Sequence, residues 1–306
     1  MGLPAGVVEF FAGTAGGVAS VLVGHPFDTV KTRLQAQAAR GHGPSQPLLP
    51  GVPLLATHYT GTLNAFGRIL REERVVGLFR GVLSPMLGVA AMNASIFFLY
   101  DASLSFLQGP YARQAEPTLA QTWWAGIASG IGSALITSPM ELFKIQQQVN
   151  TSTTRRVSYL QAIQHVWQAG GIRAIYHGLG ATCIRDIGYG PYFLVYALLN
   201  RTMLGMHAGP NPTLSNAELA VSGALAGVVA WLSTYWADVV KTRMQAEPLA
   251  SLRGPTPSFL TILRATFREG GWHALFAGAG TTVVRAIPAN AALFVVYEGV
   301  KRELRE

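Results

Sequence analysis

An acidic residue is followed three residues later by lysine and seven residues later by glutamine at three places in this sequence. The three sets are Asp28, Lys31 and Gln35; Glu141, Lys144 and Gln148; and Asp238, Lys241 and Gln245. Each set lies at the end of a long apolar segment, where solvation alone poorly explains a repeated arrangement of charges. Self-similarity of this kind predicts a chain built from copies of one supersecondary unit.

The apolar segments are long enough to cross a membrane. Half of the 306 residues are hydrophobic and 12% are charged, whereas in a soluble protein about a quarter are charged. A membrane-spanning helix needs about 20 mostly apolar residues. We expect six spans, near residues 5–36, 82–107, 118–148, 179–203, 215–246 and 279–301. Asp186 and Arg285 within them predict an inward, wet face, because charge facing lipid is costly.

Basic residues are concentrated in the loops on one side of these predicted spans. Segments 38–81, 149–177 and 247–277 hold most of the loop arginines, whereas segments 108–117 and 204–214 hold only Arg113. The positive-inside rule then orients the chain, and six spans place both termini on the side opposite the basic loops. The net charge of +8 is not gathered on one soluble face, so we expect no nucleic-acid partner.

The sequence argues against an enzyme, a cofactor-dependent protein or a metalloprotein. Cys183 is the single cysteine, so neither an internal disulfide nor a thiolate metal site is expected. No Ser/His/Asp arrangement, His-Glu-x-x-His run or paired carboxylates suggest catalysis. Residues 1–8 contain no Arg-rich presequence and no cleavable signal pattern, so targeting information is expected within the mature chain.

Other features recur at equivalent distances from each acid. Each odd-numbered span carries a Gly-x-x-x-Gly step, which lets helix backbones approach closely in lipid. The steps are Gly13 and Gly17, Gly126 and Gly130, and Gly223 and Gly227. After each acid come a polar loop, a short amphipathic stretch and an aromatic-x-Gly element. The repeated unit is therefore span, loop, short surface helix and span, which predicts repeats at 1–110, 111–208 and 209–306; residues 41–53 are expected to be a loop insertion.

The runs PFDTVKTRLQ (26–35), PMELFK (139–144) and WADVVKTRMQ (236–245) resemble the motif of the mitochondrial carrier family. The resemblance covers nearly the whole chain and implies an all-α membrane protein. Three tandem two-helix repeats would form a six-transmembrane-helix pseudo-threefold bundle around a cavity, with short surface helices on the matrix side. It also implies an antiporter of the mitochondrial inner membrane that works by alternating access, with both termini in the intermembrane space.

The resemblance further implies a ring of ion pairs that acts as a matrix gate. Its pairs are Asp28 with Lys144, Glu141 with Lys241, and Asp238 with Lys31, and its braces are Gln35, Gln148 and Gln245. The residues alone leave open a pair within each helix, since side chains three apart share a helix face. A buried ion pair adds little net stability, so such a ring suits a gate that substrate binding opens.

Two positions depart from the family pattern on the matrix side. Trp236 replaces the proline that would bend an odd-numbered helix, so we expect a weaker or differently produced bend there. Gln146 stands where the other repeats have Arg33 and Arg243, and no consequence follows from the sequence.

The family's second motif, on the opposite side, is incomplete. Leu104 replaces a base and Leu198 replaces an acid, so only Asp101 and Arg201 remain to pair as a cytoplasmic gate. We therefore expect a weak outer gate and a matrix-closed resting state. A role of these residues on a solvated surface is an equally open interpretation.

Gly81, Gly178 and Gly278 close the aromatic-x-Gly elements and open the even-numbered helices. Free backbone N–H groups at a helix start attract anions, and the resemblance implies cardiolipin as a lipid partner there. The alternative is that each glycine serves the turn alone. We expect the protein to act as a monomer.

Residues that break the threefold symmetry are the better candidates for substrate binding, because a small solute has no such symmetry. Seven residues after each of these glycines lie Gly88, Arg185 and Arg285, and Asp186 follows. The arginines can bind a carboxylate through two hydrogen bonds, and Asp186 can bind an ammonium. The alternative is that these ions neutralise each other or pair elsewhere. Trp231 and Asn93 complete the candidate set, although helix packing is the more ordinary role of both.

This set of charges suits a zwitterionic or cationic amino acid. The strings VGHPFDTVK (23–31), WLSTY (231–235) and PANAA (288–292) resemble the basic amino acid branch of the family, with carnitine/acylcarnitine carriers next. We therefore expect exchange of arginine-, lysine- or ornithine-like amino acids. The alternative from another class is a degenerate carrier with a proton-leak or regulatory role.

Overall fold

A computed structural model describes residues 5–38, 59–109, 116–149, 158–207, 213–247 and 256–304. Within these ranges the chain forms helices and turns and no strand. It divides into two compact units: Met1–Ala91, Ser138–Gly178 and Val239–Glu306 make up the first, and Met92–Thr137 and Leu179–Asp238 the second. The expected insertion at 41–53 lies outside the described residues.

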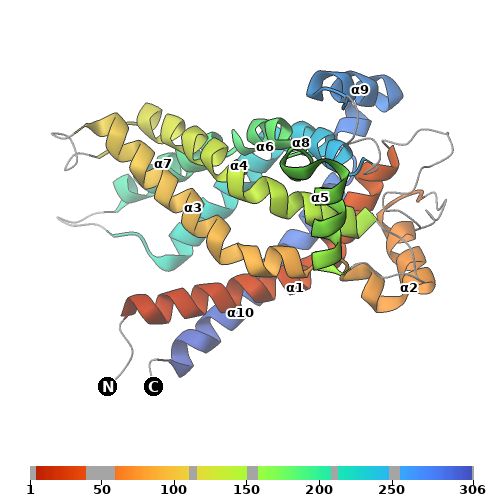
Figure 1. Cartoon of the computed structure of the whole chain (residues 1–306). Coiled ribbons are helices and arrows are strands. Elements are labelled where there is room, and N and C mark those ends of the chain that lie inside the picture. The colour runs from red at the N-terminus through yellow and green to blue at the C-terminus, as the bar shows by residue number, and fades with distance from the viewer. Residues whose placement is uncertain are drawn as a thin grey trace. The chain divides into compact units, whose positions relative to one another are not determined.

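Five of the predicted spans are single long helices. They are α1 (Ala5–Ala38), α3 (Leu83–Gln108), α4 (Leu119–Val149), α8 (Asn216–Gln245) and α10 (Ala279–Glu303). Three of the boundaries between the two units fall inside α3, α4 and α8, and the fourth falls directly before α6 (Leu179–Asp186). Figure 1 shows the helices in chain order by colour.

The fourth predicted span is two helices and not one, α6 (Leu179–Asp186) and α7 (Tyr189–Met206). Pro191 has no N–H with which to bond the carbonyl of Ile187. The N–H of Gly190 bonds that carbonyl instead, at 2.9 Å. This tighter turn separates α6 from α7, directly after Arg185 and Asp186.

Three surface helices follow the odd-numbered spans, as the repeat predicts: α2 (Thr62–Leu78), α5 (Tyr159–Ile175) and α9 (Phe259–Leu275). Ser158 caps α5 by accepting a hydrogen bond from the Gln161 N–H, and Ser258 caps α9 in the same way. Two of the three surface helices thus begin at a serine whose side chain satisfies an otherwise unpaired N–H group.

Two of the surface helices pack on the segment that carries the preceding acid and lysine. Val30 of α1 forms a buried cluster with Ala65, Ile69 and Leu78 of α2. Leu142 and Phe143 of α4 form the matching cluster with Val166, Ala169 and Ala174 of α5. Burying these apolar faces fixes each surface helix against the end of a long helix.

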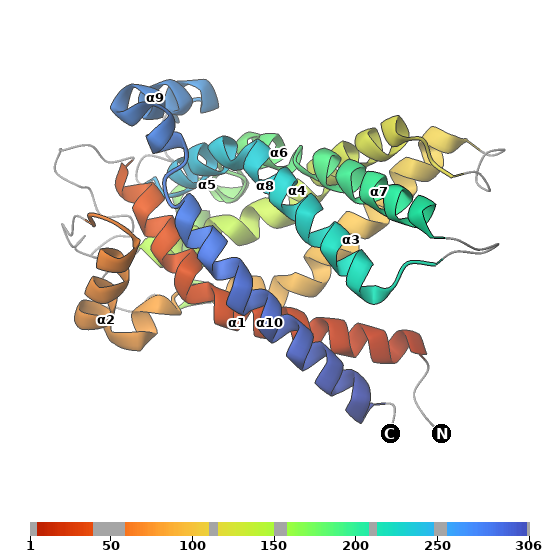
Figure 2. The ribbon, with the colours of Figure 1, turned by 180° about the vertical axis from the view of Figure 1, so that it is seen from behind.

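In the first unit, α1 and α10 lie side by side in both views (Figures 1 and 2). A Cβ on Gly16 would lie 2.8 Å from the Leu293 carbonyl oxygen, so the backbones approach too closely there for a side chain. The close contact is made by Gly16, whereas a Cβ on Gly13 would meet nothing within 4 Å among the described residues. The predicted close approach is therefore not made at Gly13.

In the second unit, the predicted glycine step of α4 packs against the break between α6 and α7. A Cβ on Gly126 would lie 2.6 Å from the Tyr189 carbonyl oxygen, and one on Gly130 would clash with the Asp186 carbonyl oxygen. By contrast, a Cβ on Gly227 would meet nothing within 4 Å among the described residues. Close packing through Gly-x-x-x-Gly thus holds for α4 and does not hold at Gly227.

Two described helical stretches are long and apolar enough to cross a membrane, Ala217–Gln245 and Phe259–Glu303. The pair Thr62–Gly88 and Ala91–Gln108, bent by 44°, would be a third.

Candidate functional site

The ends of α1, α4 and α8 meet in the first unit. Ala36, Ile145, Val149 and Ala246 form a buried apolar cluster that joins residues from all three repeats. The acid–lysine–glutamine sets lie in these same helices; their acids lie one to two turns before the cluster and their glutamines lie beside or within it. Within the first unit, the fold therefore brings the charges of the first two sets and Lys241 toward one place.

Two of the three implied ion pairs are present, and both join different helices. Lys144 Nζ of α4 donates a hydrogen bond to Asp28 Oδ2 of α1 at 2.7 Å. Lys241 of α8 pairs with Glu141 of α4, and its side chain is 2% exposed. Asp238 and Lys31 belong to different units, so their pairing stays a prediction.

The three glutamines are almost fully buried and reach across to other repeats. Gln35 Nε2 donates to the Ala277 carbonyl at 3.3 Å, and Gln245 Nε2 to the His177 carbonyl at 3.4 Å. Both acceptors are the middle residues of aromatic-x-Gly elements. These glutamines therefore hold the ends of long helices against the turns of another repeat.

His25 takes the corresponding place at the third such junction. Its Nε2 donates to the Arg80 carbonyl at 2.8 Å, and Gln148 Nε2 lies 3.4 Å from the same ring nitrogen. Gln148 also accepts a hydrogen bond from Thr32 Oγ1 at 2.8 Å. His25 is fully buried, so it acts here as a structural hydrogen-bond donor between the brace and the turn.

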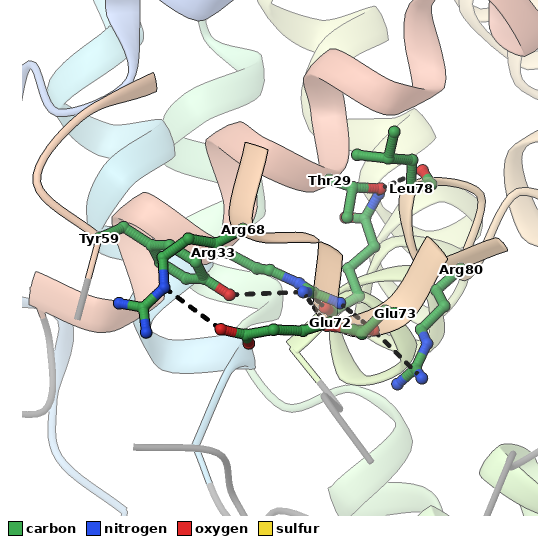
Figure 3. A network of polar contacts seen from close by, with 9 residues as sticks. Thr29, Arg33, Tyr59, Arg68, Glu72, Glu73, Leu78 and Arg80 are labelled. Carbon is green, nitrogen blue, oxygen red and sulfur yellow. Dashed lines mark hydrogen bonds and ion pairs between the residues drawn. The ribbon is translucent and has the colours of Figure 1, made fainter. Parts of the chain in front are cut away.

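A buried network of charges ties α1 to α2 (Figure 3). Arg33 donates two hydrogen bonds to Glu73, one of them at 3.0 Å, and Arg80 lies 3.1 Å from the same carboxylate. Arg33 Nε also donates to the Gln148 carbonyl at 2.8 Å. Sequence reasoning missed this network. The available signals were Arg33 and Glu73, a base and an acid of the first repeat.

The network explains the departure at Gln146. In the third repeat, Arg243 donates to Glu269 at 2.8 Å. Counting from the even-helix glycines, the position of Glu269 is occupied by Ala169 in the second repeat. The second repeat therefore lacks the acid as well as the base, and Gln146 donates to the carbonyls of Gln245 and Glu247.

The glycines proposed to bind lipid are also needed by the turns in which they lie. Gly81, Gly178 and Gly278 have φ values of 78°, 84° and 80°, which L side chains rarely adopt. A Cβ on Gly81 would lie 2.9 Å from the Lys144 carbonyl oxygen. The geometry thus shows that the turns require glycine at these positions, whether or not a lipid binds there.

Arg185 and Asp186 contact each other. Arg185 Nε donates to Asp186 Oδ1 at 2.6 Å, and the Asp186 side chain is 3% exposed. This is the mutual neutralisation that the sequence left open. Either ion of the pair could bind a charged group of a ligand only if that group replaced its present partner.

Arg285 pairs outside the even-numbered helices. Its Nε lies 3.3 Å from Asp28 Oδ1, and its side chain is 34% exposed. The sequence left open that Arg285 pairs elsewhere. Its partner is Asp28, a residue of the predicted matrix gate. Asp28 is contacted on its other oxygen by Lys144.

The remaining candidates for substrate binding are Gly88, Asn93 and Trp231. Gly88 is buried and Asn93 is exposed. Trp231 packs edge-on against Tyr235, with ring centroids 4.5 Å apart. This contact matches the packing role that the sequence left open for Trp231. The indole of Trp236 donates to the Ser233 carbonyl at 3.0 Å.

The predicted cytoplasmic gate pair is not formed. Arg201 donates to the Pro117 carbonyl, and its Nε lies 3.8 Å from Glu116 Oε2. Among the described residues it makes no ion pair with Asp101, which is exposed. Glu116 lies in a short segment that gave no motif, so sequence reasoning did not find it.

Comparison with known proteins matches this architecture. The family model described as mitochondrial carrier protein matches residues 5–111, 115–207 and 212–306. A mitochondrial basic amino acids transporter of Bos taurus is 36% identical over 293 residues, which cover 94% of this chain and 89% of that protein. The human transporter of the same name is also 36% identical, over 94% of this chain and 87% of its own. The human mitochondrial carnitine/acylcarnitine carrier protein is 35% identical over 95% of this chain and 92% of its own. The chain therefore belongs to the mitochondrial carrier family, with its all-α, pseudo-threefold fold of six transmembrane helices.

Proposed function

We propose that this mitochondrial carrier exchanges basic or zwitterionic amino acids, of the arginine, lysine and ornithine type, across the inner membrane by alternating access. Arg285 carries the proposal: its Nε is buried without a hydrogen bond among the described residues, and its side chain is one-third exposed. Such a cation is suited to a carboxylate, which can accept two hydrogen bonds from a guanidinium.

The Arg185–Asp186 pair supplies the charges for the rest of the substrate. An ammonium or guanidinium group of the substrate would replace Arg185 on Asp186. The buried surroundings of Asp186 strengthen this contact because the local dielectric is low. The names of the bovine and human relatives support a basic amino acid over other solutes.

The ion pairs Asp28–Lys144 and Glu141–Lys241, and the absence of an Asp101–Arg201 pair among the described residues, support a matrix-closed state. In this proposal the basic loops face the matrix and both termini face the intermembrane space. The carrier acts as a monomer, and cardiolipin binds at the starts of α3, α6 and α10. Salt-dependent loss of cardiolipin from the purified protein would test the lipid contact.

A screen of thermal stability tests the substrate assignment. A ligand that binds the folded state alone raises its apparent stability, by about 2.7 kcal/mol at a hundred times its dissociation constant. We expect arginine, lysine and ornithine to raise the melting temperature of the purified carrier, and ADP to leave it unchanged. No shift with any basic amino acid would reject the assignment.

Acylcarnitine exchange is the second candidate, because the human carnitine/acylcarnitine carrier is nearly as similar to this chain. Carnitine also joins a carboxylate to a cationic nitrogen, so the same charges would suit it. A larger shift with carnitine than with arginine would favour this candidate over the first.

A further inference from the structure

The break between α6 and α7 directly follows Asp186, the acid proposed to bind a cationic group. The N–H of Gly188 bonds the Arg185 carbonyl at 3.1 Å. The N–H of Gly190 bonds the Ile187 carbonyl at 2.9 Å. These bonds span three residues, whereas the bonds of an α-helix span four, so α6 ends at Asp186 and α7 is a separate helix. Interrupted membrane helices often form the binding sites of transporters.

The backbone of α4 packs against this break. A Cβ on Gly126 would lie 2.6 Å from the Tyr189 carbonyl oxygen, and one on Gly130 would clash with the carbonyl oxygen of Asp186 itself. Because these are approaches of backbone to backbone, a side chain at either glycine would displace the break. The main chain of Asp186 is therefore held against α4.

The helix α8 packs against the same break at Gly188, two residues after Asp186. A Cβ on Gly188 would lie 2.8 Å from Thr234 Oγ1 and 3.2 Å from the Ala230 carbonyl oxygen. The Thr234 hydroxyl donates a hydrogen bond to that carbonyl at 3.2 Å, which holds Oγ1 in place beside the glycine. The backbone next to Asp186 is thus confined by α8 as well as by α4.

This confinement bears on the Asp186 carboxylate. The Asp186 side chain is 3% exposed, and Arg185 Nε donates to it at 2.6 Å. A ligand cation that replaces Arg185 meets a carboxylate whose main chain cannot move toward it. Binding groups have to be held within about 0.5 Å of the productive geometry, so the position of the break decides whether this contact forms.

We propose that Gly188 and Thr234 are positioning residues of the substrate site: their contact fixes the α6–α7 break so that the Asp186 carboxylate lies where it binds the cationic group of the substrate. This rests on the proposed function, which supplies a substrate with a guanidinium or ammonium group. Neither residue touches the substrate in this account, and each acts through Asp186.

A thermal-stability cycle without substrate tests the contact itself. Gly188→Ala should lower the melting temperature, because the methyl group meets Thr234 Oγ1. The loss should be smaller in a Thr234→Ala background, where that oxygen is absent. Gly180→Ala in α6 is the matched control, because a Cβ there meets nothing within 4 Å among the described residues. An equal loss from Gly188→Ala in both backgrounds would overturn the proposed contact.

The kinetics of arginine exchange in proteoliposomes test the positioning. Thr234→Ala should raise the KM for arginine by about tenfold, since a misplacement of about 1 Å can cost about a hundredfold. The kcat should be nearly unchanged, which is the sign of lost binding, and Thr234→Ser, which keeps the hydroxyl, should retain the wild-type KM. Ser233→Ala is the matched control, since Ser233 Oγ donates to the same Ala230 carbonyl at 2.7 Å but is not among the atoms nearest to Gly188. An unchanged KM in Thr234→Ala, or an equal rise in Ser233→Ala, would overturn the proposal.

A comparison in an Asp186→Asn background tests whether the effect acts through Asp186. Arginine binding is measured as the concentration that gives half of the maximal thermal shift. Asp186→Asn should bind arginine more weakly than the wild type, and adding Thr234→Ala should weaken binding no further. A further weakening as large as that in the wild-type background would overturn the proposal. A carrier that does not respond to arginine would overturn the proposed substrate, while the cycle without substrate would still decide whether α8 holds the break.

Discussion

Lys144 of α4 donates a 2.7 Å hydrogen bond to Asp28 of α1 and so joins the second repeat to the first. The two side chains are 20% and 22% exposed, so neither ion has full access to solvent. Asp28 and Glu141 are each paired with the lysine of another helix. In these two cases the repeated charges therefore link the repeats and do not form pairs within one helix.

Removal of the Lys144 ammonium should therefore loosen the matrix side. Lys144→Met leaves the Asp28 carboxylate partly buried without its hydrogen bond from α4, and the folded state should be destabilised by about 1–3 kcal/mol. Melting of the purified protein without substrate measures this effect. Lys144→Arg is the control that keeps the charge; equal destabilisation by both variants would show that charge is not the cause.

A side chain at Gly130 should disrupt the packing of α4 against the α6–α7 break. Gly130→Ala would force a methyl group onto the Asp186 carbonyl oxygen and should cost about 1–3 kcal/mol. Gly227→Ala at the equivalent position of α8 meets open space and should cost nothing. Similar melting temperatures for the two variants would contradict the observed packing.

The second repeat should not tolerate the arginine of the other repeats. Gln146→Arg would bury a cation without a carboxylate partner, which costs about 3–5 kcal/mol. Adding Ala169→Glu supplies the acid that the third repeat has at this position. The double variant should be more stable than Gln146→Arg alone; if it is less stable, the two positions do not correspond as the repeat register indicates.

Arg74 should be a source of strain. Its φ of 61° and ψ of −170° lie in a region that only glycine adopts readily, at a cost of about 1–3 kcal/mol for other residues. Glycines with φ of 59° and 56° occupy the equivalent positions 171 and 271. Arg74→Gly should raise the melting temperature, and Gly171→Arg should lower it. A decrease in the stability of Arg74→Gly would contradict this account.

Stability should fall on acidification through His177. Burial lowers the pKa of His177, and a hydrogen bond to the Met244 carbonyl partly opposes this effect. The unfolded chain therefore binds a proton more readily below about pH 6.5, and the stabilisation present above that pH is lost as pH decreases. His177→Gln should show a smaller decrease in melting temperature between about pH 7.5 and 5.5. Glu247 Oε2 lies 3.9 Å away; a steeper decrease in the variant would mean that this carboxylate dominates.

The sequence predicted the long helices well because apolar length and repeated motifs both indicate them. The expected spans and the observed helices agree within a few residues. The apolar run continues through the break after Asp186, so apolar length alone predicts one helix there and not two. Pro191 and Gly188 were the available signals, since one removes a donor and the other favours a turn.

The site was predictable where it repeats and less so where it depends on tertiary contacts. The partners of Asp28 and Glu141 followed from resemblance to a family, whereas spacing alone left a pair within each helix open. Spacing cannot show that His25 lies between Gln148 and the Arg80 carbonyl. Nor can it show that Arg285 reaches Asp28, because that contact depends on how two helices far apart in sequence pack.

Exchange in proteoliposomes tests the central claim most directly. Vesicles loaded with arginine should take up labelled arginine, lysine or ornithine. Empty vesicles should not, and Arg285→Ala should reduce exchange by at least tenfold, which corresponds to about 1.4 kcal/mol. No counter-exchange of any basic amino acid by a folded carrier, or full exchange by Arg285→Ala, would contradict the account.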